Sequence, residues 1–161
     1  MSGFERTIIE TISVGETEAL GIRLACALSG GMLITLSGEL GAGKTVFVRG
    51  VACGLNMPAG IVVTSPTYVL LHTYRGGRLT LHHIDVYRIV GGSVEFEASG
   101  LSECLNDLES VICLEWPERL SDFKLPEDHL KVQIEHSEPQ RRRIILTASG
   151  PRSYAALKQI S

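Results

Sequence analysis

The spacing of apolar residues changes along the first third of the chain, and each period predicts a different element. Residues 6–13 are rich in β-branched side chains that partly alternate with polar ones, which predicts a short strand. Within residues 15–29 three leucines recur at every fourth position, so they line one face of a helix that Ser13 would cap. The apolar run of residues 32–37 is bounded by glycines and predicts a buried strand, and residues 44–55 have the pattern of a helix.

The rest of the chain adds strand patterns that do not alternate with helices in the same way. Tyr68 to Arg75 and Arg78 to Asp85 are strand-like, and Gly76-Gly77 between them predicts a hairpin with a tight turn. Further predicted elements are helical pieces over 93–107, a buried strand over 110–115, an antiparallel pair over 129–135 and 141–148, and a short helix from about Tyr154. Together the pattern predicts a three-layer α/β fold with a mixed sheet, an inserted β-hairpin and C-terminal antiparallel strands.

Composition narrows the class of protein. A length of 161 residues predicts one domain over residues 1–161, and 44% hydrophobic with 20% charged residues excludes a disordered or fibrous chain. A net charge of −3 argues against tight stand-alone binding of DNA or RNA. The apolar runs are far shorter than the ~20 residues of a membrane helix, and the first residues lack signal-peptide character, so we expect a cytoplasmic protein without membrane contact. The four cysteines form no C-x-x-C pair and are predicted to be small core residues.

The strongest motif is Gly38-Glu-Leu-Gly-Ala-Gly-Lys-Thr45, a complete G-x-x-x-x-G-K-[ST] phosphate-binding loop between a predicted strand and a predicted helix. Its glycines at 38, 41 and 43 permit the unusual dihedrals that turn successive backbone N–H groups toward phosphate oxygens. The N-terminus of the following helix adds partial positive charge. Lys44 would reach the β- and γ-oxygens of a nucleotide, and the Thr45 hydroxyl would ligate Mg²⁺. The motif therefore predicts a P-loop NTPase fold.

Three further segments carry hydroxyl or carboxylate groups that such a site can use. Ser65, in a hydroxyl-rich loop over residues 64–68, can contact a γ-phosphate or the attacking water, although an ordinary turn explains the pattern equally well. Asp85 ends a predicted strand and can orient water; the alternatives are an ion pair with Arg88 and a purely structural His83. Glu115 ends the apolar strand that would lie beside the phosphate loop, which points it at magnesium.

Taken in order, four signatures resemble the TsaE family of bacterial ATPases, also called YjeE. These are the phosphate loop, Ser65-Pro66-Thr67-Tyr68, His83-x-Asp85-x-Tyr87-Arg88 and Glu115-Trp116-Pro117. The resemblance covers about residues 10–120. It implies an ATP- and Mg²⁺-binding accessory ATPase that works with the partners TsaB and TsaD. Together these proteins make N6-threonylcarbamoyladenosine (t6A) at position 37 of tRNA, which the ATPase subunit reaches only indirectly through the complex.

The same resemblance assigns roles to residues. It implies that Lys44, Asp85 and Glu115 serve catalysis and that Thr45 and Glu115 hold the metal. The nucleotide contacts that it implies are Glu16, Thr17, Gly38, Glu39, Leu40, Gly41, Ala42, Gly43, Lys44, Thr45, Val46, Ser65 and Thr67. Glu16 and Thr17 would lie near the adenine. Val46 departs from a second threonine that is frequent in the family, but the phosphate cradle does not need that side chain. Trp116 would cover the site or pack beside it, and packing is the favoured interpretation.

A GTPase is excluded because no N-K-x-D guanine motif occurs in the sequence. Two other functions compete with the hypothesis of an accessory ATPase, a small-molecule kinase and a nucleotide-sensing module. A small-molecule kinase usually carries arginines on a late helical lid, whereas Arg141–Arg143 lie in a predicted strand and are more typical of a solvated strand end. The other competing function is an interaction module that senses a nucleotide without useful turnover of it.

Overall fold

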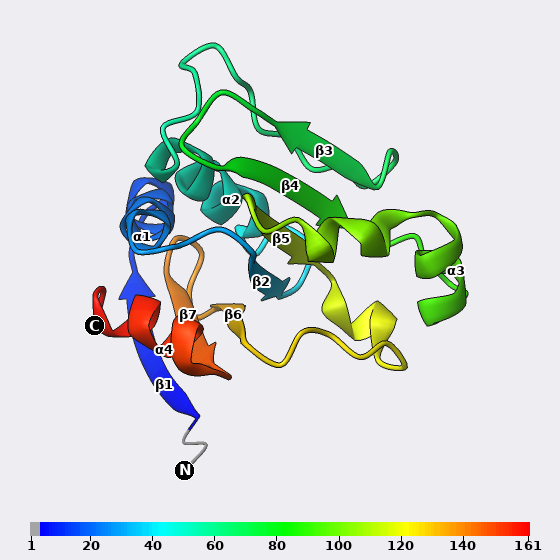
Figure 1. Ribbon diagram of the computed structural model, residues 1–161. Coiled ribbons are helices and arrows are strands. Elements are labelled where there is room, and N and C mark those ends of the chain that lie inside the picture. The colour runs from blue at the N-terminus through cyan, green and yellow to red at the C-terminus, as the bar shows by residue number, and fades with distance from the viewer. Residues whose placement is uncertain (1–3) are drawn as a thin grey trace.

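A computed structural model describes residues 4–161, which form a seven-stranded mixed sheet with helices on both faces (Figure 1). The strands are β1 (Glu5–Thr11), β2 (Met32–Ser37), β3 (Leu71–Tyr74), β4 (Thr80–Asp85), β5 (Ser110–Glu115), β6 (His129–His136) and β7 (Arg142–Ala148). The helices are α1 (Val14–Cys26), α2 (Lys44–Gly54), α3 (Gly92–Ala98) and α4 (Pro151–Lys158), with 3-10 helices η1 (Leu101–Asn106) and η2 (Pro117–Leu120). The predicted three-layer α/β fold is confirmed.

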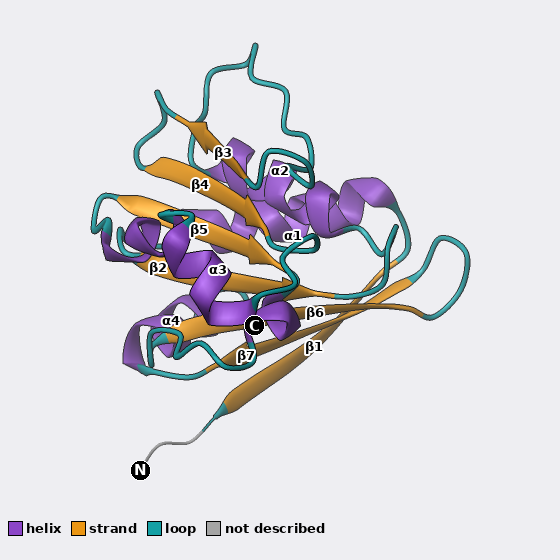
Figure 2. Cartoon of the chain, turned by 90° about the vertical axis from the view of Figure 1, so that its right-hand side faces the viewer, coloured by secondary structure: helices purple, strands orange, loops and turns teal. Residues whose placement is uncertain are grey.

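The strand order is β1-β7-β6-β2-β5-β4-β3, and Figure 2 shows the strands one below another, with β3 at the top of the sheet and β1 at the bottom. Strands β4, β5, β2 and β6 run parallel, whereas β3, β7 and β1 pair antiparallel with their neighbours. The central β2 and β5 are buried along almost their whole length, as their uninterrupted apolar runs predict. Because parallel strands present their carboxyl ends at one edge, the segments that follow β2, β4 and β5 meet there.

Apolar side chains alternate between two cores, one on each face of the sheet. On one face Leu24 of α1 and Phe47 of α2 pack with Ile34 of β2. On the other face Phe96 of α3 packs with Ile112 of β5. The phosphate-loop helix α2 is therefore packed firmly against one face of β2 and β5, and this packing fixes the position and direction of its N-terminus.

The predicted hairpin exists, but its turn is longer and its first strand shorter than the sequence indicates. Tyr74 pairs with Leu81, so Gly76-Gly77 belong to a wider loop and not to a two-residue turn. Arg78 binds that loop to the helices. Its backbone N–H donates to the Leu55 carbonyl at the end of α2 at 2.9 Å, and its guanidinium donates to carbonyls at the end of α1. These contacts come from residues far away in the sequence, so the local pattern does not reveal them.

The helical predictions also need adjustment. The helical pieces expected over residues 93–107 are α3 and η1, and they are separated at Gly100, whose φ of 78° ends the first piece. The last helix begins at Pro151 and not near Tyr154. Its first turn is capped from a distance because the Asp128 carboxylate accepts hydrogen bonds from the backbone N–H groups of Arg152 and Ser153, at 2.8 and 3.0 Å.

All four cysteines are free thiols, as predicted, but only Cys113 is fully buried. Cys26 and Cys53 are exposed, so the prediction that the cysteines are core residues is wrong for these two. They lie in the last turns of α1 and α2, on the exposed side of each helix, although their sequence neighbours are apolar. Within residues 4–161 the helices are too short or too polar to cross a membrane.

Candidate functional site

The phosphate loop has the backbone that its glycines predict. Gly38, Gly41 and Gly43 adopt φ values of 149°, 78° and 111°. A Cβ at Gly38 would lie 2.5 Å from the carbonyl oxygen of Ile134, so a side chain is sterically excluded there. The loop leaves β2 and enters α2 at Lys44, which brings the free N–H groups of the helix N-terminus to the loop. This is the strand–loop–helix context that the motif requires.

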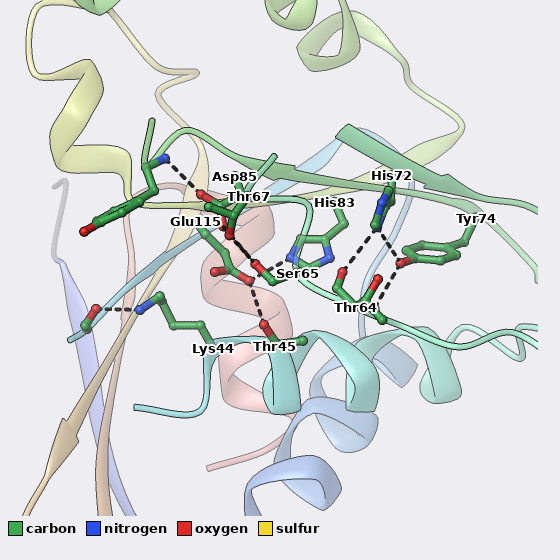
Figure 3. A network of polar contacts seen from close by, with 12 residues as sticks. Lys44, Thr45, Thr64, Ser65, Thr67, His72, Tyr74, His83, Asp85 and Glu115 are labelled. Carbon is green, nitrogen blue, oxygen red and sulfur yellow. Dashed lines mark hydrogen bonds and ion pairs between the residues drawn. The ribbon is translucent and has the colours of Figure 1, made fainter. Parts of the chain in front are cut away.

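Lys44 is almost fully buried and points back into the loop (Figure 3). Its ammonium donates hydrogen bonds to the carbonyls of Gly38 and Glu39 at 2.5 and 3.0 Å, and lies 4.0 Å from the centroid of the Trp116 ring. Burial lowers the pKa of Lys44, and nearby carboxylates, first that of Glu115, oppose the shift. To bind a phosphate, the ammonium would exchange these neutral carbonyl partners for charged oxygens.

Glu115 and Asp85 end adjacent parallel strands and are direct register partners. The Thr45 hydroxyl donates to Glu115 Oε1 at 3.4 Å, so the last residue of β5 meets the first turn of α2. The same Oε1 accepts from Nε2 of His83 at 2.7 Å (Figure 3). Both acids are nearly inaccessible, with exposed fractions of 1% for Asp85 and 2% for Glu115. The structure thus brings both predicted acids to the end of the phosphate loop.

Asp85 holds the hydroxyl-rich loop. Its Oδ2 accepts from Ser65 Oγ and Thr67 Oγ1, each at 2.9 Å, and its Oδ1 accepts from the Tyr87 backbone N–H at 2.9 Å (Figure 3). The alternative of an Asp85–Arg88 ion pair is wrong, because the Arg88 guanidinium lies over the Tyr68 ring at 4.6 Å. The loop over residues 64–68 is therefore more than an ordinary turn feeding a strand.

These groups surround one cavity of about 360 Å³. It is lined by Leu40, Gly41, Gly43, Lys44, Thr45, Val46, Ser65, Thr67, Asp85, Glu115 and Trp116. Trp116 both lines the cavity and packs on Tyr87, with ring centroids 4.8 Å apart, so the two interpretations of this residue hold together. Residues that bear hydroxyls, two carboxylates and one ammonium thus line a common space together with the phosphate loop.

A second cavity of about 310 Å³ adjoins the first through Gly41, Gly43 and Val46. Its lining is Ser13, Val14, Thr17, Gly41, Ala42, Gly43, Val46, Pro139, Gln140 and Arg142. Thr17 therefore lies beside the phosphate loop, and its nearness to an adenine stays a prediction. Glu16 does not line this cavity, because its carboxylate accepts a hydrogen bond from the Ile12 N–H at 2.8 Å beside the start of α1. Gly38 and Glu39 border a different hollow, toward β6.

The loop between β6 and β7 contributes to the site in a way that the sequence does not predict. The pattern favours a solvated strand end for Arg142, but its Nε donates to the Ala42 carbonyl of the phosphate loop at 2.9 Å. Its NH1 binds the Pro139 carbonyl at 3.1 Å, so one side chain ties the two loops together. The arginine run at 141–143 is the only sequence signal, and it does not say which arginine turns inward.

The oxygen groups of the first cavity fit a magnesium–nucleotide complex. Within residues 4–161, groups of three or more His, Cys, Asp or Glu side chains that could hold a metal are absent. Mg²⁺ in nucleotide sites is usually bound by one or two protein oxygens together with substrate phosphates and waters. The Thr45 hydroxyl and the Glu115 carboxylate, 3.4 Å apart, supply such a pair.

Fold and site together define a phosphate-loop α/β protein. The family model described as "Threonylcarbamoyl adenosine biosynthesis protein TsaE" matches residues 11–145, and the chain belongs to this family. It is 35% identical to the tRNA threonylcarbamoyladenosine biosynthesis protein TsaE of Bacillus subtilis over 94% of this chain and 91% of the relative. It is 41% identical to the protein of the same name from Streptomyces coelicolor over 83% of this chain and 90% of the relative. The crystal structure of Bacillus subtilis YdiB superposes with a TM-score of 0.82 at 29% identity, covering 99% of this chain and 97% of that one.

Proposed function

We propose that this chain binds ATP with Mg²⁺ and hydrolyses it as an accessory subunit of tRNA t6A biosynthesis at position 37, in the cytoplasm. The observation that carries the proposal is the single cavity in which the phosphate loop, Thr45, Asp85 and Glu115 meet. Membership of a family whose relatives are named for t6A biosynthesis supplies the pathway. The kinase alternative loses support because Arg142 and Arg143 lie on β7 and not on a helical lid.

Each group has a role that follows from its position. The loop N–H groups and Lys44 would neutralise the phosphate oxygens, and Thr45 with Glu115 would hold Mg²⁺, which when bound screens the charge between the β- and γ-phosphates. Asp85, with Ser65 and Thr67, would orient the water that attacks the γ-phosphorus. As the water oxygen bonds to the γ-phosphorus, the bond from that phosphorus to the bridging oxygen would break, and ADP would leave together with a phosphate that carries the protons of the water.

Adenine nucleotides are expected to bind more tightly than guanine nucleotides, by about 10-fold, or roughly one hydrogen bond. The second cavity, lined by Val14, Thr17 and Gln140, would receive the base, and the sequence has no N-K-x-D motif to recognise guanine. Calorimetry with ADP and GDP measures the difference. Equal or tighter binding of GDP would contradict this assignment, and ADP binding to Lys44→Ala provides the control for occupancy of the phosphate loop.

The proposed partners are TsaD and TsaB. A chain with a net charge of −3 has no excess positive charge with which to hold tRNA by itself, so we expect it to reach the RNA only through the complex. Mixing the purified chain with TsaD and TsaB from the same organism should give an assembly and stimulate ATP hydrolysis. A Lys44→Ala chain in the same mixture controls for contaminating ATPases. If neither association nor stimulation occurs, the accessory role is wrong, whereas ATP binding is tested separately.

A further inference from the structure

His83 is the most deeply buried polar side chain beside the phosphate cavity. Its exposed fraction is 0%, and it sits on β4 two residues before Asp85. Side chains two apart on a strand point to the same face, so His83 faces the same way as Asp85. In the neighbouring β5, Cys113 is the register partner of His83, and Glu115 is the partner of Asp85. The imidazole therefore lies under the two acids of the site.

The imidazole makes one hydrogen bond in the described part of the chain, and that bond goes to the site. His83 Nε2 lies 2.7 Å from Glu115 Oε1, and the two side chains are 0% and 3% exposed. A carboxylate only accepts, so Nε2 carries the hydrogen and donates it. Within residues 4–161, Nδ1 has no hydrogen-bond partner. Leaving a buried polar atom unpaired costs stability, so the contact with Glu115 is the favourable polar interaction that a histidine adds at this position.

The adjacent His82 shows what a structurally satisfied histidine looks like in this strand. It points to the opposite face, where Nδ1 is paired with the Thr73 hydroxyl at 3.0 Å and Nε2 with the Asp107 carboxylate at 2.9 Å. Both of its nitrogens have partners. His83 differs because, among residues 4–161, its one hydrogen-bond partner is an acid that lines the phosphate-loop cavity.

We propose that His83 is a positioning residue for Glu115. A glutamate side chain has three rotatable bonds, and the Nε2–H contact fixes the carboxylate on the side of Thr45, whose hydroxyl lies 3.4 Å from the same Oε1. Groups that orient a metal-side ligand are known to affect metal affinity and activity about 10- to 100-fold when they are replaced. The inference rests on the proposed function, since it concerns the acid that would hold the magnesium of the nucleotide complex.

A matched pair of amides at position 83 tests the proposal. The amide nitrogen of Gln reaches the place of the imidazole Nε2, whereas the shorter Asn reaches only the place of Nδ1. ATP binding to the full chain is measured by calorimetry over a range of Mg²⁺ concentrations and in EDTA. His83→Gln is expected to keep the Mg²⁺ dependence of the wild type. His83→Asn is expected to need roughly 10-fold more Mg²⁺ for the same ATP affinity, with unchanged binding in EDTA.

The controls separate this role from a general effect on folding. His82→Asn makes the same change on the opposite face and should leave the Mg²⁺ dependence of ATP binding unchanged. Melting curves establish that each variant is folded at the assay temperature, and His83→Leu, which also lacks the donor, replaces the Asn variant if that chain does not fold. Equal Mg²⁺ dependence in the Asn and Gln variants, or an equal loss with and without Mg²⁺, would overturn the proposal. A wild-type chain whose ATP affinity ignores Mg²⁺ would instead overturn the proposed function, and the role of His83 with it.

Discussion

Asp85→Asn is expected to lower ATP hydrolysis by about 100-fold in the presence of partners, while Mg²⁺–ATP binding stays close to that of the wild type. The substitution is nearly isosteric, and the local contacts can survive it. The amide oxygen can still accept from the Tyr87 N–H, and the amide NH₂ can donate to the hydroxyls of Ser65 and Thr67, which rotate to accept. What is lost is the negative charge beside the attacking water.

Glu115→Gln is the comparison that distinguishes an acid beside the attacking water from an acid that holds the metal. Because Glu115 contacts the Thr45 hydroxyl, loss of its charge should make ATP binding less sensitive to Mg²⁺, an effect that Asp85→Asn should lack. Asp107→Asn, at a carboxylate that pairs with His82 away from the cavity, is the matched control and should change neither quantity. Turnover per folded molecule and Mg²⁺ titrations measure the two effects. The reverse pattern, with Asp85 controlling the metal dependence, would exchange the two assignments and leave the ATPase proposal standing.

Lys44→Ala is expected to weaken ATP binding about 10-fold or more, because a charge-assisted contact to phosphate contributes about 1.5–3 kcal/mol. The fold should persist, since the ammonium's partners are loop carbonyls and the ring of Trp116 rather than core groups. Trp116 is the only tryptophan of the chain, so its fluorescence reports directly on this site during a nucleotide titration. Calorimetry gives the affinity, and a melting curve checks the fold.

Lys124→Ala is the control for this variant, because Lys124 is 84% exposed and forms a surface ion pair with Glu127. It should bind ATP like the wild type. An unchanged dissociation constant for Lys44→Ala would show that nucleotide does not occupy the phosphate loop, and would remove the site on which the proposed function rests.

Local sequence patterns are sufficient wherever one short segment decides its own conformation. Gly38 and Gly43 adopt positive φ, which a glycine permits by its residue type alone, whereas the lack of room for a Cβ at Gly38 comes from the distant Ile134 carbonyl. The apolar run of β5 specifies a strand buried on both faces, and the acid at its end then falls at the sheet edge where the loop lies. For this reason the sequence alone is enough to place Lys44, Thr45 and Glu115 in one site.

Contacts between distant segments cannot be predicted in this way. Asp85 could equally have paired with Arg88, three residues away, and only the return of the loop at residues 64–68 to the end of β4 gives it the hydroxyls of Ser65 and Thr67. Arg142 reaches the phosphate loop from 100 residues away because β6 lies beside β2. Its neighbours in the arginine run have the same chemistry and different surroundings.

The sequence by itself therefore determined the class of loop, its glycine-dependent backbone and the two acids, because these follow from residue type and short-range spacing. The tertiary structure decided which hydroxyls Asp85 binds, that His83 contacts Glu115, and that the β6–β7 loop lines the second cavity. Each of these depends on strand order and register, which bring together residues 18 to 100 positions apart. A periodic pattern says which way a side chain points from its own strand, but not what it meets there.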